Sequence, residues 1–360
     1  MTSSWLFDRL NRISTLEGYV KPQKINDDDA LKLDSNENLA LNKNFISKIA
    51  LRAAKRIDLR EYPQGEFEMQ LYMQLAKYLG INKTYLAIGS GSDQIIELIL
   101  STIGRDLRVT VFTPTFSYFI NRCELHGLVV DSVALNKEDN TINEVNFLKS
   151  AKKSHIVYIC SPNNPTGNQF CKQSILNIID KLKDKLILID EAYVEFADYS
   201  LASDIISYDN IIVLRTLSKA FGLAGARVGY LVTNQRFAEI FRTTIQSPYP
   251  LNSLSLIIAS IMLSYSDYVK KTVELVKKER KKVFERLRGI NGIKAFKSNA
   301  NFIFIESYDK YQSILEELKD EKLIVKALGD VDGHKGCIRV TIGTKEMNDK
   351  FLKSVERVVA

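Results

Sequence analysis

Residues 216–227, TLSKAFGLAGAR, decide the fold, because they join a lysine, Lys219, to two glycines and a final Arg227. The stretch lies between two short apolar runs, residues 211–214 and 229–232. Four similar runs precede it, at residues 85–88, 109–112, 156–159 and 186–189, with helix-period segments between them. Short apolar runs that alternate with helices are typical of buried parallel strands. The sequence therefore predicts an α/β fold in which helices cover both faces of a mostly parallel sheet.

The pattern changes after residue 250 to long helical stretches, and short strands are expected near residues 300–305, 323–327 and 337–341. We therefore predict three parts. Residues 1–40 form an N-terminal arm that packs on the smaller domain, residues 41–250 form the large domain, and residues 251–360 form a connecting helix and a small α+β domain.

Composition excludes several classes of protein. The chain has 360 residues and a net charge of +7, but its basic residues are interspersed with acids, which favours a solvated surface over a nucleic-acid site. No apolar stretch reaches the roughly 18 residues that span a bilayer, and the first residues do not resemble a signal peptide, so a cytoplasmic protein is expected. The four cysteines and three histidines lack metal-ligand spacing, so we expect no metal site.

Two motifs could bind a phosphate group. Ser92 and Asp93 lie between a predicted strand and a predicted helix, where free backbone N–H groups bind anions, although an ordinary helix cap has the same residues. Ser218 and Arg227 flank Lys219, and a guanidinium matches the geometry of phosphate oxygens. A serine–lysine pair alone would be an ordinary surface feature, so the specificity of this motif comes from the whole run through Arg227.

Three further residues could bind a heterocyclic ring. Asn164 lies in the turn SPNNPTG, residues 161–167, and could donate to a ring oxygen, whereas Asn163 could serve the turn alone. Asp190 ends a buried run, where a protonated pyridine nitrogen would compensate its charge. Tyr193 could also reach the ring oxygen, or be structural. Since a lysine amine attacks aldehydes, these residues predict a pyridoxal 5'-phosphate site with Lys219, Asp190 and Tyr193 as catalytic residues.

These motifs resemble those of the fold-type I aminotransferases and, within them, the histidinol-phosphate aminotransferase family, over essentially the whole chain. The motifs that carry the resemblance are Asn36-Glu37-Asn38, Tyr62-Pro63, residues 91–93, 161–167, 190–193, 218–227 and RVTIGT at residues 339–344. The resemblance implies transamination between L-histidinol phosphate and 2-oxoglutarate in histidine biosynthesis. It also implies a homodimer in which Tyr62 reaches the cofactor phosphate of the partner subunit.

The resemblance implies four substrate-binding residues: Tyr19, Asn36, Lys326 and Arg339. Arg339 would bind an acidic group of each substrate, and Tyr19 the substrate phosphate, unless it is a packing aromatic of the arm. The sequence departs from the family at Gly18 and Leu39 for proline, Gln94 for glutamate, Phe116 for a tyrosine that stacks on the cofactor ring, and Lys326 for arginine. A lysine is a point charge that cannot bind phosphate bidentately, whereas Phe116 retains the stacking surface as a cofactor-binding residue.

Other functions on the same scaffold remain open from the sequence. An aromatic amino-acid aminotransferase or a phospho-amino-acid decarboxylase, such as one acting on threonine phosphate, would keep the same cofactor residues. A pyridoxal-phosphate-binding transcription regulator would need an added helix-turn-helix domain, of which the sequence shows no sign.

Overall fold

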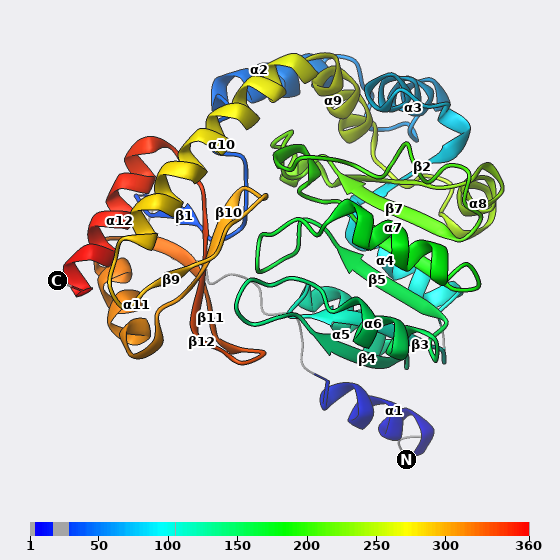
Figure 1. Cartoon of the computed structure of the whole chain (residues 1–360). Coiled ribbons are helices and arrows are strands. Elements are labelled where there is room, and N and C mark those ends of the chain that lie inside the picture. Colours follow the sequence, from blue (N-terminus) through cyan, green and yellow to red (C-terminus); the bar gives the residue numbers. More distant parts are fainter. Residues whose placement is uncertain (1–3, 17–28, 105, 360) are drawn as a thin grey trace.

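The computed structural model describes residues 4–16, 29–104 and 106–359, and these form two sheets (Figure 1). The larger sheet has the strand order β2-β8-β7-β6-β5-β3-β4. Its strands are β2 (Leu86–Ser90), β3 (Arg108–Thr113), β4 (Val129–Ala134), β5 (Ile156–Cys160), β6 (Leu186–Asp190), β7 (Ile211–Thr216) and β8 (Val228–Val232). Neighbouring strands from β4 to β7 pair in parallel, and β8 is antiparallel to both β2 and β7. The predicted α/β fold with a mostly parallel sheet is confirmed.

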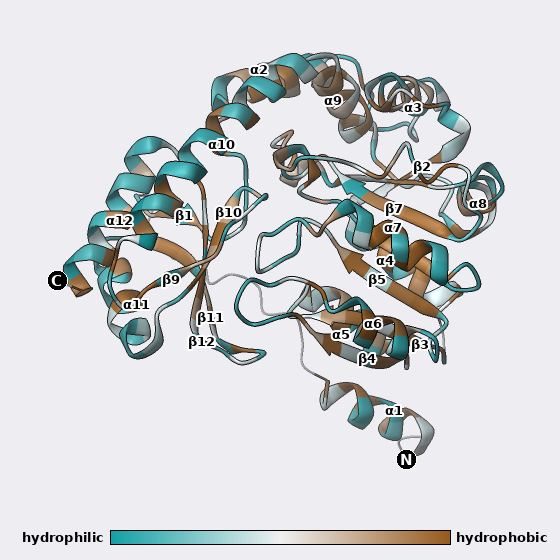
Figure 2. Cartoon of the chain, viewed as in Figure 1, coloured by the Kyte–Doolittle hydropathy of each residue, from teal (hydrophilic) through white to brown (hydrophobic). Residues whose placement is uncertain are grey.

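The strands of this sheet are continuous apolar runs because helices bury both of its faces. On β6, Ile187 and Ile189 belong to one core cluster, and Leu188, which points the opposite way, belongs to the other. The first cluster includes residues of α6 (Glu144–Ala151) and α7 (Lys172–Lys181), and the second includes residues of α4 (Gly91–Thr102) and α5 (Ser117–Leu125). Figure 2 shows the resulting hydrophobic strands between amphipathic helices.

The strand β4 was not predicted, because it lies at the edge of the sheet and carries Asp131 and Ser132 in place of an unbroken apolar run. Each of its side chains is half-buried or exposed, and none is fully buried. At the other end of the sheet, Tyr85 lies in a 3₁₀ turn, Lys83–Tyr85, so the strand expected to begin there starts at Leu86.

The smaller sheet has the order β1-β11-β12-β10-β9. Its strands are β1 (Leu31–Leu33), β9 (Lys294–Ala295), β10 (Phe302–Glu306), β11 (Leu323–Val331) and β12 (His334–Thr341), and α11 (Tyr311–Asp320) and α12 (Lys345–Val359) pack beside them. The N-terminal segment contributes β1, which pairs in parallel with β11. The division into three parts at residues 40 and 250 stays a prediction.

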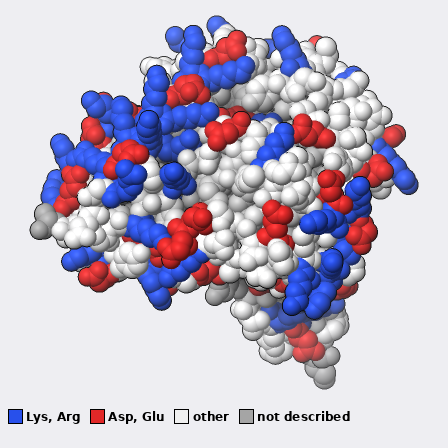
Figure 3. Space-filling model, viewed as in Figure 1, with Lys and Arg blue, Asp and Glu red and all other residues white. Residues whose placement is uncertain are grey.

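Helices α2 (Lys43–Ala54), α3 (Gly65–Leu79) and α9 (Ser253–Ser264) pack together, and α8 (Gln235–Ile240) follows β8. The long α10 (Ser266–Arg288) then leads to the smaller sheet, and α1 (Ser4–Ser14) lies at the N-terminal end (Figure 1). Many of the basic residues of α10 pair with acids, as in the Lys282–Glu279 and Arg288–Glu285 ion pairs. Figure 3 shows the same mixture of charges over one face of the molecule.

Four strands of the large sheet end at one place. Their last residues, Thr113 of β3, Cys160 of β5, Asp190 of β6 and Thr216 of β7, all line one cavity. The carboxyl ends of parallel strands are where ligands bind in open α/β sheets. No helix within the described ranges has the length and apolarity needed to cross a membrane.

Candidate active site

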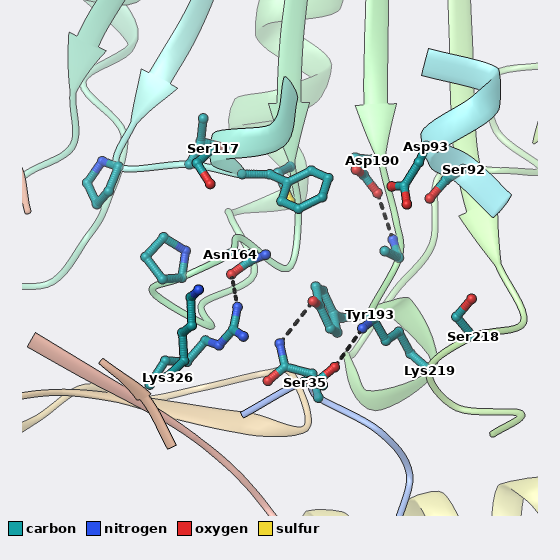
Figure 4. Close-up of a pocket in the computed structure, with 18 of the residues that line it drawn as sticks. Ser35, Ser92, Asp93, Ser117, Asn164, Asp190, Tyr193, Ser218, Lys219 and Lys326 are labelled. Carbon is teal, nitrogen blue, oxygen red and sulfur yellow. Dashed lines mark hydrogen bonds between the residues drawn. The ribbon is translucent and has the colours of Figure 1, made fainter. Parts of the chain in front are cut away.

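The cavity at the strand ends lies between the two sheets and has a volume of about 490 Å³. Known small-molecule sites fall within roughly 300–1,000 Å³. The large sheet contributes the strand ends and the loops that follow them, and the smaller sheet contributes Lys326 and Arg339. Figure 4 shows these side chains converging from both sides. The cavity is therefore large enough for a cofactor together with a small substrate.

Lys219 points into the cavity from the loop that follows β7. Its Nζ donates to the carbonyl oxygen of Ser35 at 2.9 Å, and it lies 5.7 Å from the centre of the Tyr193 ring (Figure 4). Burial lowers the pKa of Lys219 to about 8, and the positive charge of Arg339 acts in the same direction. Near neutral pH part of the population is therefore the neutral amine, which is the nucleophilic form.

Asp190 is 2% exposed, and each of its carboxylate oxygens accepts a hydrogen bond. The backbone N–H of Ala192 donates to Oδ1 at 3.0 Å, and the hydroxyl of Tyr158 donates to Oδ2 at 2.8 Å. Burial raises the pKa of Asp190 to about 6, and the Tyr158 hydrogen bond opposes this increase. Asp190 is thus a buried carboxylate that is still mostly ionised at pH 7.

Asn164 is oriented by the smaller sheet. Nη1 of Arg339 donates to its Oδ1 at 2.6 Å, so its amide nitrogen points to the other side (Figure 4). Asn163, in contrast, is used within the loop, because its amide donates to the carbonyl of Pro114 and to the hydroxyl of Thr166. The geometry of the turn therefore separates the two asparagines, and only Asn164 lines the cavity.

Tyr193 lies opposite Lys219 and is 4% exposed. Nδ2 of Asn36 donates to its hydroxyl oxygen at 3.0 Å, and its ring meets Phe302 edge to face. Asn36 has a φ of 56° and is itself held by the hydroxyl of Thr341. Asn36 therefore positions Tyr193 in this arrangement, and both side chains lie at the cavity.

The first turn of α4 forms one wall of the cavity. The Ser90 side chain does not cap its N-terminus, whereas Oε1 of Gln94 accepts from the backbone N–H of Ser90 at 2.6 Å. Ser92 and Asp93 lie in this turn. The Asp93 carboxylate accepts from Nη2 of Arg227 at 2.9 Å, and Arg227 has a φ of 53°. Gly229 brings β8 against this turn, since a Cβ at 229 would lie 2.3 Å from the nitrogen of Ser92. Backbone N–H groups and a guanidinium are thus gathered as an anion site requires.

Ser218 and Phe116 also line the cavity. The Ser218 hydroxyl accepts from the hydroxyl of Thr216 at 2.9 Å, so the side chain is fixed beside the strand end. Phe116 occupies the N-cap position of α5. Their positions agree with a phosphate contact and a ring-stacking surface, respectively, which stay predictions.

Lys326 and Arg339 are direct partners across β11 and β12. Burial lowers the pKa of Lys326, and the neighbouring charge of Arg339 adds to this effect. Nη2 of Arg339 donates to the carbonyl oxygen of Asp34 at 2.6 Å, and the guanidinium lies over the Phe302 ring. Two cations side by side at a cavity favour a ligand with at least two negative charges.

One predicted residue, Tyr62, lies outside the cavity. Tyr62 is 76% exposed, stacks on Tyr249 with ring centres 4.7 Å apart, and does not line the cavity of this subunit. Tyr19 lies outside the described residues. Tyr158 was not predicted as a site residue, although a tyrosine within the apolar run of β5 was a visible signal.

Comparison with known proteins identifies the class. Residues 28–355 match the family model described as aminotransferase class I and II. The chain therefore belongs to the class I and II aminotransferases, and the predicted aminotransferase function is confirmed. More narrowly, it belongs to the histidinol-phosphate aminotransferase family, since the enzyme of that name from Pyrococcus furiosus is 36% identical over 85% of this chain and 86% of its own.

Solved structures agree with the fold. The histidinol-phosphate aminotransferase from Clostridium acetobutylicum has a TM-score of 0.83 and 25% identity, and the match covers 91% of this chain and 98% of that one. The enzyme of the same name from Sinorhizobium meliloti, solved in complex with pyridoxal 5'-phosphate, has a TM-score of 0.84 over 97% of this chain and 96% of its own. At 22% identity, this second likeness bears on the fold alone.

Proposed function

We propose that this chain transfers an amino group between L-histidinol phosphate and 2-oxoglutarate, forming imidazole-acetol phosphate and glutamate, as a step of histidine biosynthesis. One observation carries the proposal: the cationic pair Lys326 and Arg339 faces the same cavity as the nucleophilic Lys219. A phosphate dianion satisfies such a pair better than an uncharged aromatic ring does. Family membership supplies the reaction type.

The cavity fits pyridoxal 5'-phosphate. Asp190 is a buried carboxylate that a protonated pyridine nitrogen would partner, and Asn164 presents its amide nitrogen at the same cavity. Ser92, Asp93, Ser218 and Arg227 line the cavity at the N-terminus of α4, where the phosphate would be held. When bound, the cofactor supplies an aldehyde for the substrate amine and a ring that accepts the electron pair released at the substrate carbon.

With the cofactor bound, the residues of the cavity would have separate roles. The Lys219 amine takes the proton from the substrate carbon, which its depressed pKa of about 8 permits near neutral pH. Asp190 would hold the proton of the ring nitrogen, and Tyr193, whose hydroxyl oxygen accepts from Asn36, would donate to the ring oxygen. Phe116 would provide the apolar surface for the ring.

Arg339 and Lys326 bind the acidic end of each substrate. The guanidinium of Arg339 is already aligned, because Asn164 and Asp34 accept from its two terminal nitrogens. Lys326 adds a second positive charge beside it, which suits the two negative charges of a phosphate group. Asn36 and Tyr19 complete the predicted substrate-binding residues.

We further infer that two subunits share their sites, and that Tyr62 reaches the cofactor phosphate of the partner subunit. Tyr62 does not line the cavity of its own chain and stacks on the exposed Tyr249. Further exposed apolar side chains lie on α2, on α3 and in the loop between them: Leu51, Leu59, Met69 and Met73. Exposed apolar side chains on neighbouring elements favour an interface. A cytoplasmic location stays a prediction.

A half-reaction tests the substrate. Purified protein loaded with pyridoxal 5'-phosphate is mixed with L-histidinol phosphate, and separately with phenylalanine and phosphothreonine, while cofactor absorbance is followed and products are identified. We expect rapid conversion of the cofactor to its amine form with histidinol phosphate alone. Preference for phenylalanine, or carbon dioxide released from phosphothreonine, would instead assign an aromatic aminotransferase or a phospho-amino-acid decarboxylase.

A further inference from the structure

Tyr158 is a polar residue at the centre of β5, in the sequence IVYIC, and it is 1% exposed. A hydroxyl buried among strands needs a hydrogen-bond partner, because leaving it unpaired costs free energy. The hydroxyl of Tyr158 donates to Oδ2 of Asp190 at 2.8 Å. The two residues belong to neighbouring strands, β5 and β6, which pair in parallel. The contact therefore connects the centre of β5 to the end of β6, where Asp190 lines the cavity.

The ring of Tyr158 is fixed from the other side by Phe119. The two rings stack with their centres 3.7 Å apart and an interplanar angle of 10°. Phe119 belongs to α5, which begins immediately after the cavity residue Phe116. The position of the Tyr158 hydroxyl is thus determined by packing, and it places Oδ2 of Asp190 in one orientation.

The electrostatic surroundings of Asp190 make this hydrogen bond important. Burial raises the pKa of Asp190, and Tyr158 is the strongest of the groups that oppose burial. The other titratable groups facing the carboxylate are Cys160 on β5, Asp93 on α4, Tyr193 in the loop after β6 and Lys219 in the loop after β7. Of these, Asp93 disfavours the charged carboxylate, and Lys219 favours it.

We propose that Tyr158 is a positioning residue of the reaction, which orients the Asp190 carboxylate and keeps it ionised so that it can hold a proton on the cofactor ring. The inference rests on the proposed function, because it concerns the same site. Tyr158 does not line the cavity itself and acts through Asp190. A hydrogen bond to a charged group is stronger than one between neutral groups, so its loss affects the ionised form most.

The test is Tyr158→Phe, which removes one oxygen and retains the stacking ring. The full chain is labelled with ¹³C at its aspartate carboxyls, and Asp190 is assigned by its loss in Asp190→Asn. We expect the pKa of Asp190 to rise by about one to two pH units in Tyr158→Phe. The dissociation constant of pyridoxal 5'-phosphate should increase about tenfold at pH 7, with a smaller increase at pH 9, where Asp190 is ionised again.

Tyr230→Phe is the matched control. Tyr230 is as deeply buried, and its hydroxyl has no hydrogen-bond partner among the described residues. It should leave the Asp190 titration and cofactor affinity unchanged. An unaltered Asp190 pKa in Tyr158→Phe, or equal losses in both variants, would overturn the proposal. The carboxyl titration needs no substrate, so its result stands apart from the question of which amine is the donor.

Discussion

Gly229→Ala should weaken cofactor binding by steric means alone. A methyl group at position 229 would lie 2.3 Å from the carbonyl carbon of Gly91 and 2.3 Å from the nitrogen of Ser92. Ordinary van der Waals contact begins near 3.4 Å, so β8 and the first turn of α4 must separate by about 1 Å. Both contacts are backbone atoms, and the clash cannot be relieved by a side-chain rotation. Overpacking of this kind costs about 1–3 kcal/mol of stability.

The same displacement moves the N–H groups predicted to hold the cofactor phosphate. A hydrogen bond to a charged group contributes about 1.5–3 kcal/mol, so loss of one raises the dissociation constant of pyridoxal 5'-phosphate at least about tenfold. The assay is a fluorescence titration of cofactor-free protein, accompanied by a melting curve. Gly225→Ala is the control, because a methyl there meets nothing within 4 Å. Unchanged affinity and melting temperature in Gly229→Ala would refute the steric argument.

Three further predictions concern lysines at the cavity. Lys219→Ala should abolish turnover and covalent attachment while pyridoxal 5'-phosphate still binds, since the phosphate contacts remain. Borohydride reduction followed by mass measurement should detect covalently attached cofactor in the wild type and not in the variant. Attachment of the cofactor needs the neutral amine, and the pKa of Lys219 is about 8. The rate of attachment should therefore rise about tenfold per pH unit below pH 7 and level off above pH 9. Stopped-flow absorbance can measure this rate, and a flat profile would contradict the assignment. Lys326→Met should raise the KM for histidinol phosphate about tenfold and the KM for glutamate less. Lys326→Arg should leave both KM values unchanged, because the positive charge remains. Equal increases for the two substrates in Lys326→Met would argue against a phosphate contact.

The parallel part of the fold followed from the sequence because both faces of its strands are buried. Runs such as residues 186–189 have no polar interruption, and this pattern identifies a central strand. The edge strand β4 lacked that pattern, since none of its residues is fully buried and polar residues interrupt its apolar run. The antiparallel direction of β8 could not be predicted either, because an apolar run is the same in both directions.

Candidate site residues could be chosen from the sequence one motif at a time, but not their mutual contacts. The hydrogen bond from Arg339 to Asn164 joins residues 175 positions apart, and the bond from Asn36 to Tyr193 spans 157 positions. Such pairs depend on how the two sheets meet, which local patterns do not encode. Tyr158 was overlooked for a related reason, since its importance appears only when β5 lies beside β6.

The cavity takes its residues from two separate sheets. Thr113, Cys160, Asp190 and Thr216 end strands that are bonded to one another, so the chemical groups stand on one continuous platform. Lys326 and Arg339 stand on a separate sheet. Substitutions on the smaller sheet can therefore change the cations at the cavity while the strand ends stay in place. If Lys326 binds substrate as proposed, lysine in place of arginine at this position alters selectivity without altering the catalytic groups.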